Sequence, residues 1–155
     1  MTQAAAPPTI APAPAESVVR RLLASANLPA ADITPEKLET FFALERDGDV
    51  LGIVGLELYG RVGLLRSLVV SPGRRSQGAG SALVAHAERA AAGRGVAELY
   101  LLTTTAEAFF RRRGYETTAR AEAPDAIRRT AEFAGLCPST SAFMVKHLVD
   151  SRETP

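Results

Sequence analysis

The hydrophobic pattern of this chain switches several times between a helical period and a strand period. Apolar side chains first recur at helical spacing between residues 16 and 27, at Val18, Val19, Leu22 and Leu23. This spacing predicts an amphipathic helix. A second, short helix is predicted to begin at Thr34, because threonine is a good N-cap and Pro35 suits the first helical position. We expect it to end near Glu39.

Strand-like runs follow, and their spacing predicts a sheet. The runs at 40–45, 50–59 and 61–70 are separated by turn residues, which favours three consecutive antiparallel strands. Helices are then predicted at 78–94, 105–113 and 124–133, and strands at 97–103, 115–119 and 142–148. Thr9 to Ala11 lies between prolines and is a candidate edge strand. The order predicts an α/β fold of the mixed α+β type around one central sheet.

Length and composition favour one ordinary globular domain. We expect a flexible, Ala- and Pro-rich lead-in over 1–8, a single domain over 9–149 and a disordered tail over 150–155. Eighteen basic side chains against 17 acidic ones give no reason to expect nucleic acid or a membrane as a partner. One cysteine excludes an internal disulfide and fits a reducing compartment. The chain starts without the basic-then-apolar layout of a signal peptide, so a cytoplasmic protein is expected.

A segment that contains several glycines joins the predicted strand at 61–70 to the predicted helix at 78–94. The segment contains Arg75-x-x-Gly78-x-Gly80. Unpaired backbone N–H groups at a helix start, together with the helix dipole, form an anion site that suits phosphate. Gly80 is followed by Ser81-Ala82, which excludes a Walker A loop. A dinucleotide-binding fingerprint requires a third small residue at the position of Leu83, so that fingerprint is excluded as well.

This segment, with the Val-x-Pro before it, resembles the acetyl-CoA pyrophosphate loop of the GCN5-related N-acetyltransferase (GNAT) superfamily. The stretch from Thr103 to Tyr115 resembles the superfamily's later helix, which ends in an aromatic-x-x-x-Gly-Phe/Tyr pattern, and is similar to the acetyltransferase domain of N-acetylglutamate synthases. Three further segments resemble the N-acetyltransferase family encoded in bacterial arsenic-resistance operons: Gly55 to Gly60, Leu64 to Ser67, and Leu136-Cys137-Pro138.

The superfamily resemblance implies acetyl-CoA as acetyl donor, bound where two parallel strands ending near Val70 and Leu102 splay apart. It also implies direct attack by the acceptor amine in a ternary complex, where positioning and carbonyl polarisation supply most of the acceleration. The cofactor-binding residues that the resemblance implies are Leu68, Val69, Val70, Arg75, Ser76, Gln77, Gly78, Ala79, Gly80, Ser81, Thr103, Phe110 and Arg113.

The chain departs from the family pattern at the groups that move protons. Phe109 and Phe110 lack the hydroxyl that many members place in this pair to protonate the leaving thiolate. Leu64 stands where the synthase-like members have a glutamate, and Ser139-Thr140-Ser141 stands where they have an arginine for the acceptor side chain. The acid and the base therefore come from elsewhere, come from water, or are absent.

Glu57 and Cys137 are the candidate catalytic residues. Glu57 interrupts an apolar run and is either a general base, acting directly or through water, or a solvent-facing strand residue. Cys137 either protonates the leaving thiolate or is a small buried residue. Arg66 lies in an apolar strand and either binds a substrate carboxylate or phosphonate-like group or forms a structural ion pair. Ser67 and Tyr59 are assigned to substrate binding with it, and no metal is expected.

These features predict an acetyl-CoA-dependent N-acetyltransferase that modifies the amine of a small amino-acid-like acceptor. The arsenic-resistance resemblance implies a detoxifying enzyme. Two alternatives stay open: a non-catalytic acyl-CoA-binding sensor, and an acetyltransferase for an unrelated small amine or a protein N-terminus. A homodimer is also left open, because members of the superfamily often dimerise.

Overall fold

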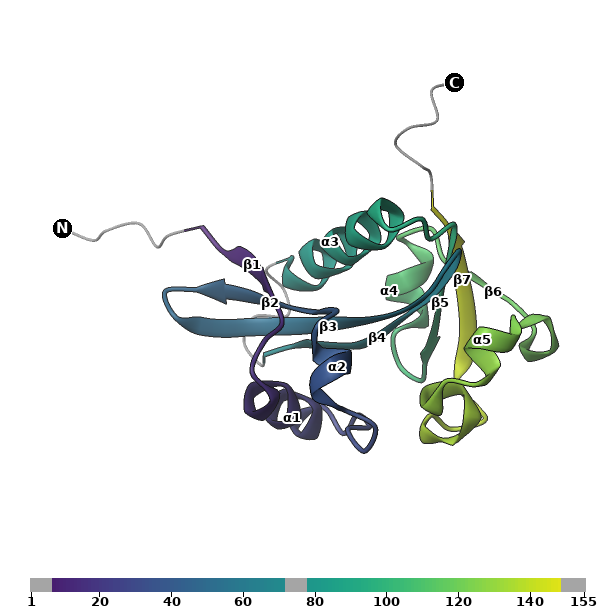
Figure 1. Cartoon of the computed structure of the whole chain (residues 1–155), viewed down its shortest axis with the longest axis horizontal. Helices are drawn as coiled ribbons and strands as arrows, with labels where there is room; N and C mark the ends of the chain where they lie inside the picture. Colours follow the sequence, from purple (N-terminus) through teal and green to yellow (C-terminus); the bar gives the residue numbers. More distant parts are fainter. Residues whose placement is uncertain (1–6, 72–77, 149–155) are drawn as a thin grey trace, which may run out of the picture. The chain divides into compact units, whose positions relative to one another are not determined.

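The computed structural model describes residues 7–71 and 78–148, which form two compact units. The first unit takes the described residues within 1–56 and 67–87, and the second takes those within 57–66 and 88–155. Three elements run from one unit into the other: β3 (Asp49–Tyr59), β4 (Val62–Val70) and α3 (Ala79–Gly93). Figure 1 shows the elements along the chain. The predicted single domain over 9–149 stays a prediction.

The described strands form one mixed sheet in the order β1-β2-β3-β4-β5-β7-β6. The pairs β1–β2, β2–β3, β5–β7 and β6–β7 are antiparallel, whereas β4 and β5 are parallel. The remaining strands are β1 (Thr9–Pro12), β2 (Phe41–Arg46), β5 (Glu98–Thr103), β6 (Glu116–Thr117) and β7 (Ala142–His147). The sheet confirms the predicted α/β fold, and β1 takes the predicted edge position.

Helices cover both faces of the sheet in the first unit. α1 (Glu16–Ser25) and α2 (Pro35–Leu38) pack on the face that carries Phe41 and Ala43. Successive strand residues point to opposite faces, and Phe42 accordingly meets His86 of α3 edge-on, with ring centroids 4.7 Å apart. Figure 1 shows α1 and α2 across β2 and β3 from the start of α3. The Thr34 hydroxyl accepts from the Lys37 N–H at 3.2 Å, which confirms the predicted cap.

The second unit buries aromatic side chains over β4, β5 and β7. Tyr100 of β5 stacks on Phe143 of β7 with centroids 5.3 Å apart, and Phe133 meets Phe143 edge-on. Ile127 joins this cluster from α5 (Asp125–Arg128), which follows the short helix η1 (Arg120–Glu122). Phe110 of α4 (Glu107–Arg111) is buried and packs edge-on against Tyr115. Among the described residues, no helix has both the length and the hydropathy that a membrane crossing requires.

The predicted helix over 124–133 is wrong in detail, because the chain there forms two short helices. The first is α5, and the second is the π-helix η2 (Glu132–Leu136). Between them the Thr130 hydroxyl donates to the Ile127 carbonyl at 2.7 Å and accepts from the Phe133 N–H at 3.3 Å. Such side-chain bonds compete with the helical backbone ladder. The predicted helix at 105–113 and strand at 115–119 are also shorter in the structure, at 107–111 and 116–117.

Candidate active site

The parallel ladder between β4 and β5 is short. It pairs Val62, Gly63 and Leu64 with Glu98, Leu99 and Tyr100. Beyond these residues β5 remains paired with β7, through Leu101 to Thr103. The next residues of β4, Leu65 and Arg66, therefore lie past the end of the described parallel ladder.

Ser67 of β4 has a backbone conformation that is rare for its residue type. Its φ is +59°, in the left-handed region that favours glycine, and the residue is buried. A non-glycine residue in such a conformation costs about 1–3 kcal/mol, and residues of this kind cluster at ligand and active sites. The strain singles out Ser67 within β4, and its predicted role in substrate binding stays a prediction.

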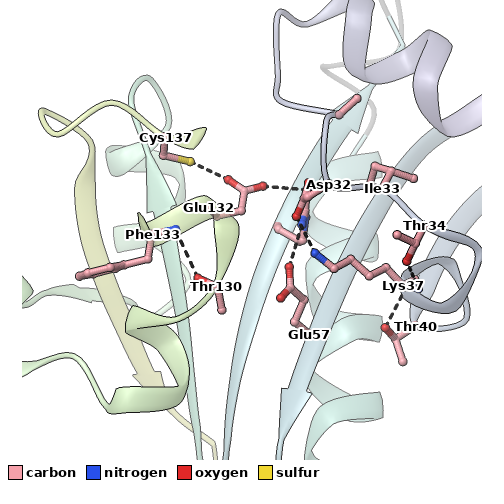
Figure 2. A network of polar contacts seen from close by, with 12 residues as sticks. Asp32, Ile33, Thr34, Lys37, Thr40, Glu57, Thr130, Glu132, Phe133 and Cys137 are labelled. Atoms are coloured by element: carbon pink, nitrogen blue, oxygen red, sulfur yellow. Dashed lines mark hydrogen bonds and ion pairs between the residues drawn. The ribbon is translucent and has the colours of Figure 1, made fainter. Parts of the chain in front are cut away.

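Arg66 lies at the centre of a buried ion-pair network. Its Nη1 is 2.7 Å from Glu57 Oε2, and its Nη2 is 3.0 Å from Glu132 Oε1. The three side chains are only 1%, 5% and 8% exposed, respectively. Figure 2 shows Glu57 and Glu132 of this network. Burial of an ion pair is costly unless the partners satisfy one another, and here one guanidinium serves two carboxylates.

The network extends from Glu132 to Cys137. The Cys137 Sγ lies 2.6 Å from Glu132 Oε2, and the Cys137 N–H donates to the Glu132 carbonyl at 3.0 Å (Figure 2). That backbone bond spans five residues, which is the spacing of a π-helix, so the π turn itself brings the thiol onto the carboxylate. Burial, and then the hydrogen bond to Glu132, raises the pKa of Cys137 to about 12. The thiol is therefore protonated at neutral pH.

Tyr59 connects the other end of the network to the surface. Its hydroxyl donates a short hydrogen bond to Glu57 Oε1. The two residues lie two apart on β3 and so share one face of the strand. Glu57 is buried, whereas Tyr59 is 39% exposed. The arrangement gives a buried carboxylate a hydrogen-bonded route to an exposed phenol.

The structure thus gathers four of the predicted site residues into one network: Glu57, Tyr59, Arg66 and Cys137. Their catalytic and substrate-binding roles stay predictions. Sequence reasoning missed Glu132, which joins Arg66 to Cys137. A signal for it existed, since an arginine inside an apolar strand requires buried anionic partners. The irregular π-helix hid which carboxylate that was.

The predicted phosphate-binding segment is described in part. Gly78 has a φ of +76°, and a Cβ added there would meet nothing within 4 Å. α3 begins at the next residue, and the Ala82 N–H donates to the Gly78 carbonyl at 3.0 Å. A glycine in this conformation directly before a 15-residue helix is typical of an anion-binding helix start, and the predicted role of Gly78 in pyrophosphate binding stays a prediction. Arg75, Ser76 and Gln77 lie outside the described residues.

Three other predicted cofactor residues make internal contacts in the second unit. The Thr103 hydroxyl accepts from the Ala106 N–H at 3.0 Å, at the start of the turn that leads into α4. Phe110 is buried. The Arg113 guanidinium lies 3.6 Å from the centroid of the Phe109 ring, and its Nη1 donates to the Phe109 carbonyl at 2.8 Å. Their contact with the cofactor stays a prediction.

A second polar cluster, which sequence reasoning also missed, surrounds Glu88 of α3. The fully buried Tyr115 donates its hydroxyl to Glu88 Oε2 at 2.9 Å, and Lys146 Nζ of β7 donates to Glu88 Oε1 at 2.9 Å. Burial raises the pKa of Tyr115 far above its usual range, with further contributions from Glu88. Across the described ranges, no group of three His, Cys, Asp or Glu side chains is arranged to hold a metal ion.

Curated sequences similar to this chain are amino-acid acetyltransferases. One from Neisseria meningitidis is 32% identical over 94 residues, which are 59% of this chain and 22% of that protein. Another, from Ralstonia nicotianae, is 34% identical over 80 residues, which are 50% of this chain and 18% of that protein. The chain therefore spans about a fifth of the length of the curated relatives that it matches.

Solved structures agree with this similarity. N-acetylglutamate synthase from Neisseria gonorrhoeae, crystallised with coenzyme A and L-arginine, superposes with a TM-score of 0.78 at 25% identity, over 91% of this chain and 33% of that one. A protein from Mycobacterium tuberculosis in complex with CoA superposes with a TM-score of 0.76 over 91% of this chain and 99% of that one. At 20% identity, the second likeness shows the fold alone.

The acetyltransferase (GNAT) domain family matches residues 37–117, just over half of the chain. The matched range includes the parallel β4–β5 pair, Gly78 and the whole of α3. The chain therefore belongs to the acetyltransferase (GNAT) domain family, which confirms the predicted superfamily and the predicted fold.

Proposed function

We propose that this chain acetylates the α-amino group of a small, amino-acid-like acceptor. The observation that carries the proposal is Arg66, a buried guanidinium in β4 that pairs with carboxylates and adjoins the strained Ser67. Guanidinium groups recognise carboxylates with defined geometry. The similar proteins named as amino-acid acetyltransferases support an acceptor of that class.

The proposed donor is acetyl-CoA, which supplies an acetyl group activated as a thioester. Backbone N–H groups of Gly78, Ala79, Gly80 and Ser81, at the start of α3, would hold its pyrophosphate. Leu68, Val69 and Val70 at the end of β4 would pair with its pantetheine arm. Both segments belong to the first unit.

The proposed reaction forms an N–C bond from the acceptor nitrogen to the acetyl carbon and breaks the C–S bond of the thioester. The nitrogen must lose a proton and the departing thiolate must gain one. Glu57 is the proposed base, and its hydrogen bond to the exposed Tyr59 offers the proton a route to solvent. Cys137, the predicted acid, is protonated at neutral pH, but its pKa is raised to about 12, which makes it a weak proton donor to a thiolate. The thiolate therefore leaves as the anion and takes up its proton from bulk solvent.

A narrower acceptor class follows from the sequence resemblance to the arsenic-resistance N-acetyltransferases. We propose a glutamate-like amino acid with an arsinic or phosphinic side chain as the first narrow class to test. Acetylation of the α-nitrogen of such a compound would make the protein a detoxifying enzyme. This narrower proposal is supported by the resembling segments around Gly55 to Gly60 and Leu136 to Pro138.

Thiol release from acetyl-CoA tests the proposal. The panel comprises L-amino acids, phosphinic and arsinic glutamate analogues, polyamines and short peptides, with acetyl-CoA binding measured in parallel. We expect release with amino acids or their analogues and none with polyamines. Tight acetyl-CoA binding without release from any acceptor would refute the enzymatic proposal and favour the acyl-CoA sensor. Release with peptides alone would refute the acceptor class.

A further inference from the structure

Arg46, the last residue of β2, has a buried side-chain nitrogen without a partner. Within residues 7–71 and 78–148, its Nε is buried and forms no hydrogen bond. Asp49 lies opposite Arg46 in the ladder between β2 and β3, yet the Nε stays unpaired. A buried N–H of a charged group that lacks an acceptor is costly, so it points to an acceptor that binds from outside the chain.

Arg46 lies on the face of β2 that α3 covers. Alternate residues of a strand share one face, so Phe42, Leu44 and Arg46 point to the same side of the sheet. Phe42 is the residue that meets His86 of α3. The register irregularity next to Leu44 places its extra residue in β3, so β2 itself keeps its alternation.

The start of α3 lies toward the end of β2 that carries Arg46. A Cβ added to Gly52 of β3 would come within 3.0 Å of the Leu83 side chain, so the early part of α3 lies over Gly52. Gly52 pairs with the β2 residue midway between Phe42 and Arg46, whereas His86 lies at Phe42 itself. Following α3 from His86 back toward its start therefore leads along β2 toward Arg46.

The lengths of the two segments match. From Leu83 back to Ala79 the helix extends about 6 Å, and from Leu44 to Arg46 the strand extends about 7 Å. β2 and β3 are about 4.8 Å apart as neighbouring strands, a distance that an arginine side chain spans. All these residues belong to the first unit, and Figure 1 shows the start of α3 on the side of the β2–β3 turn. An unsatisfied guanidinium and the N-terminus of a long helix, both of which favour anions, thus share one end of one face.

We infer that Arg46 is a donor-binding residue, whose guanidinium pairs with a phosphate of acetyl-CoA at the start of α3. The inference rests on the proposed acetyl-CoA donor and adds a residue of β2 to its site. The helix start offers only partial positive charge, whereas the guanidinium adds a full charge and a planar set of N–H donors that match phosphate oxygens. The Nε of Arg46 gains its acceptor when the donor binds.

Calorimetry with CoA as the probe tests the inference on the full chain. The variant Arg46→Met removes the charge and keeps an unbranched side chain. The matched control is Arg21→Met, which removes the same charge from an exposed position of α1, on the opposite face of the same unit. R46M is expected to bind CoA about tenfold more weakly or worse, as loss of a charge-assisted contact predicts, and R21M is expected to match the wild type. Equal affinities of R46M and the wild type would overturn the inference.

Stability without ligand separates phosphate binding from a structural role. Because the Arg46 Nε has no partner among the described residues, R46M is expected to lose no stability in urea unfolding of the free chain. A loss of stability with an unchanged CoA affinity would show a structural role and overturn the inference. Should R46M fail to fold, Arg46→Lys keeps the charge but loses the Nε–H and the planar donor set. R46K is expected to bind CoA more weakly than the wild type, and an undiminished affinity would overturn the inference.

A second probe, 3′-dephospho-CoA, identifies the phosphate that Arg46 contacts. Weaker binding of both probes by R46M assigns the contact to the pyrophosphate, which both compounds retain. Weaker binding of CoA alone assigns it to the 3′-phosphate. Either result supports the inference, and an undiminished affinity of R46M for both probes refutes it.

Failure of this inference is distinguishable from failure of the proposed donor. Binding of CoA by the wild type, with the same affinity in R46M, overturns the role of Arg46 alone. Absence of CoA binding to the wild type refutes the proposed donor and the role of Arg46 together.

Discussion

Replacing Arg66 with methionine removes the cation that Glu57 and Glu132 share in the buried network. The substitution retains an unbranched apolar chain but leaves two carboxylates, 5% and 8% exposed, without their shared partner. Breaking a buried pair in this way costs about 3–5 kcal/mol, because the surviving charge stays buried. Total stabilities of about 5–15 kcal/mol are typical, so R66M loses a large share of its stability.

Urea unfolding followed by circular dichroism measures this loss at neutral pH. In a thermal scan, the same change corresponds to a fall in Tm of about 6–20 °C, taking roughly 2–4 °C per kcal/mol for a chain of this size. The triple variant R66M/E57Q/E132Q removes all three charges and is expected to recover most of the stability.

The matched control is Arg111→Met, which breaks an ion pair with Glu107 on the surface of α4. Those two side chains are 54% and 45% exposed. A surface pair contributes about 0–1 kcal/mol, so R111M is expected to change stability little. The reasoning is refuted if R66M loses no more stability than R111M, or if the triple variant is less stable than R66M.

Three further predictions follow from single residues. Gly78→Ala places a side chain at a φ of +76° and is expected to weaken acetyl-CoA binding about tenfold, as measured by calorimetry. The control Gly93→Ala adds a Cβ at a helical position, where it would meet no atom within 4 Å, and is expected to leave the affinity unchanged. Equal affinities in the two variants would contradict this prediction. Tyr115→Phe removes the hydroxyl that donates to Glu88 and is expected to lose about 1.5–3 kcal/mol in urea unfolding, without altering acetyl-CoA affinity. Cys137 has its pKa raised from 9.0 to about 12, so its contribution to stability is complete below pH 9 and is lost as the pH rises toward 12. The unfolding free energy of the wild type is therefore expected to fall more steeply over that range than that of Cys137→Ser, and parallel curves would disprove it.

Local sequence signals predicted most of the fold. The spacing of apolar residues, the helix caps and the turn residues predicted α1, the capped α2, the strands β2 to β5 and the long α3. Each of these elements is specified by residues that are near one another in sequence. The signals failed between residues 124 and 136. There the Thr130 hydroxyl bonds to nearby backbone groups and the chain forms a π-helix, and a simple apolar period does not encode either feature.

Several individual residues of the candidate site were predictable from the sequence, but the contacts between its residues were not. Glu57 and Arg66 were conspicuous as charges within apolar strands, and Gly78 as part of a phosphate-binding pattern. That Glu132 serves Arg66, or that Tyr115 and Lys146 share Glu88, depends on contacts between residues distant in sequence. A single sequence contains the residues of these clusters but not their pairing.

Identification of the acetylated product tests the central claim most directly. The full chain is incubated with acetyl-CoA and an equimolar mixture of L-amino acids and their α-amides, and the products are separated and identified by mass spectrometry and NMR. The account predicts acetylation at the α-nitrogen of one or a few amino acids that retain a free carboxylate. Equal acetylation of the amides, or acetylation at a side-chain nitrogen alone, would contradict it.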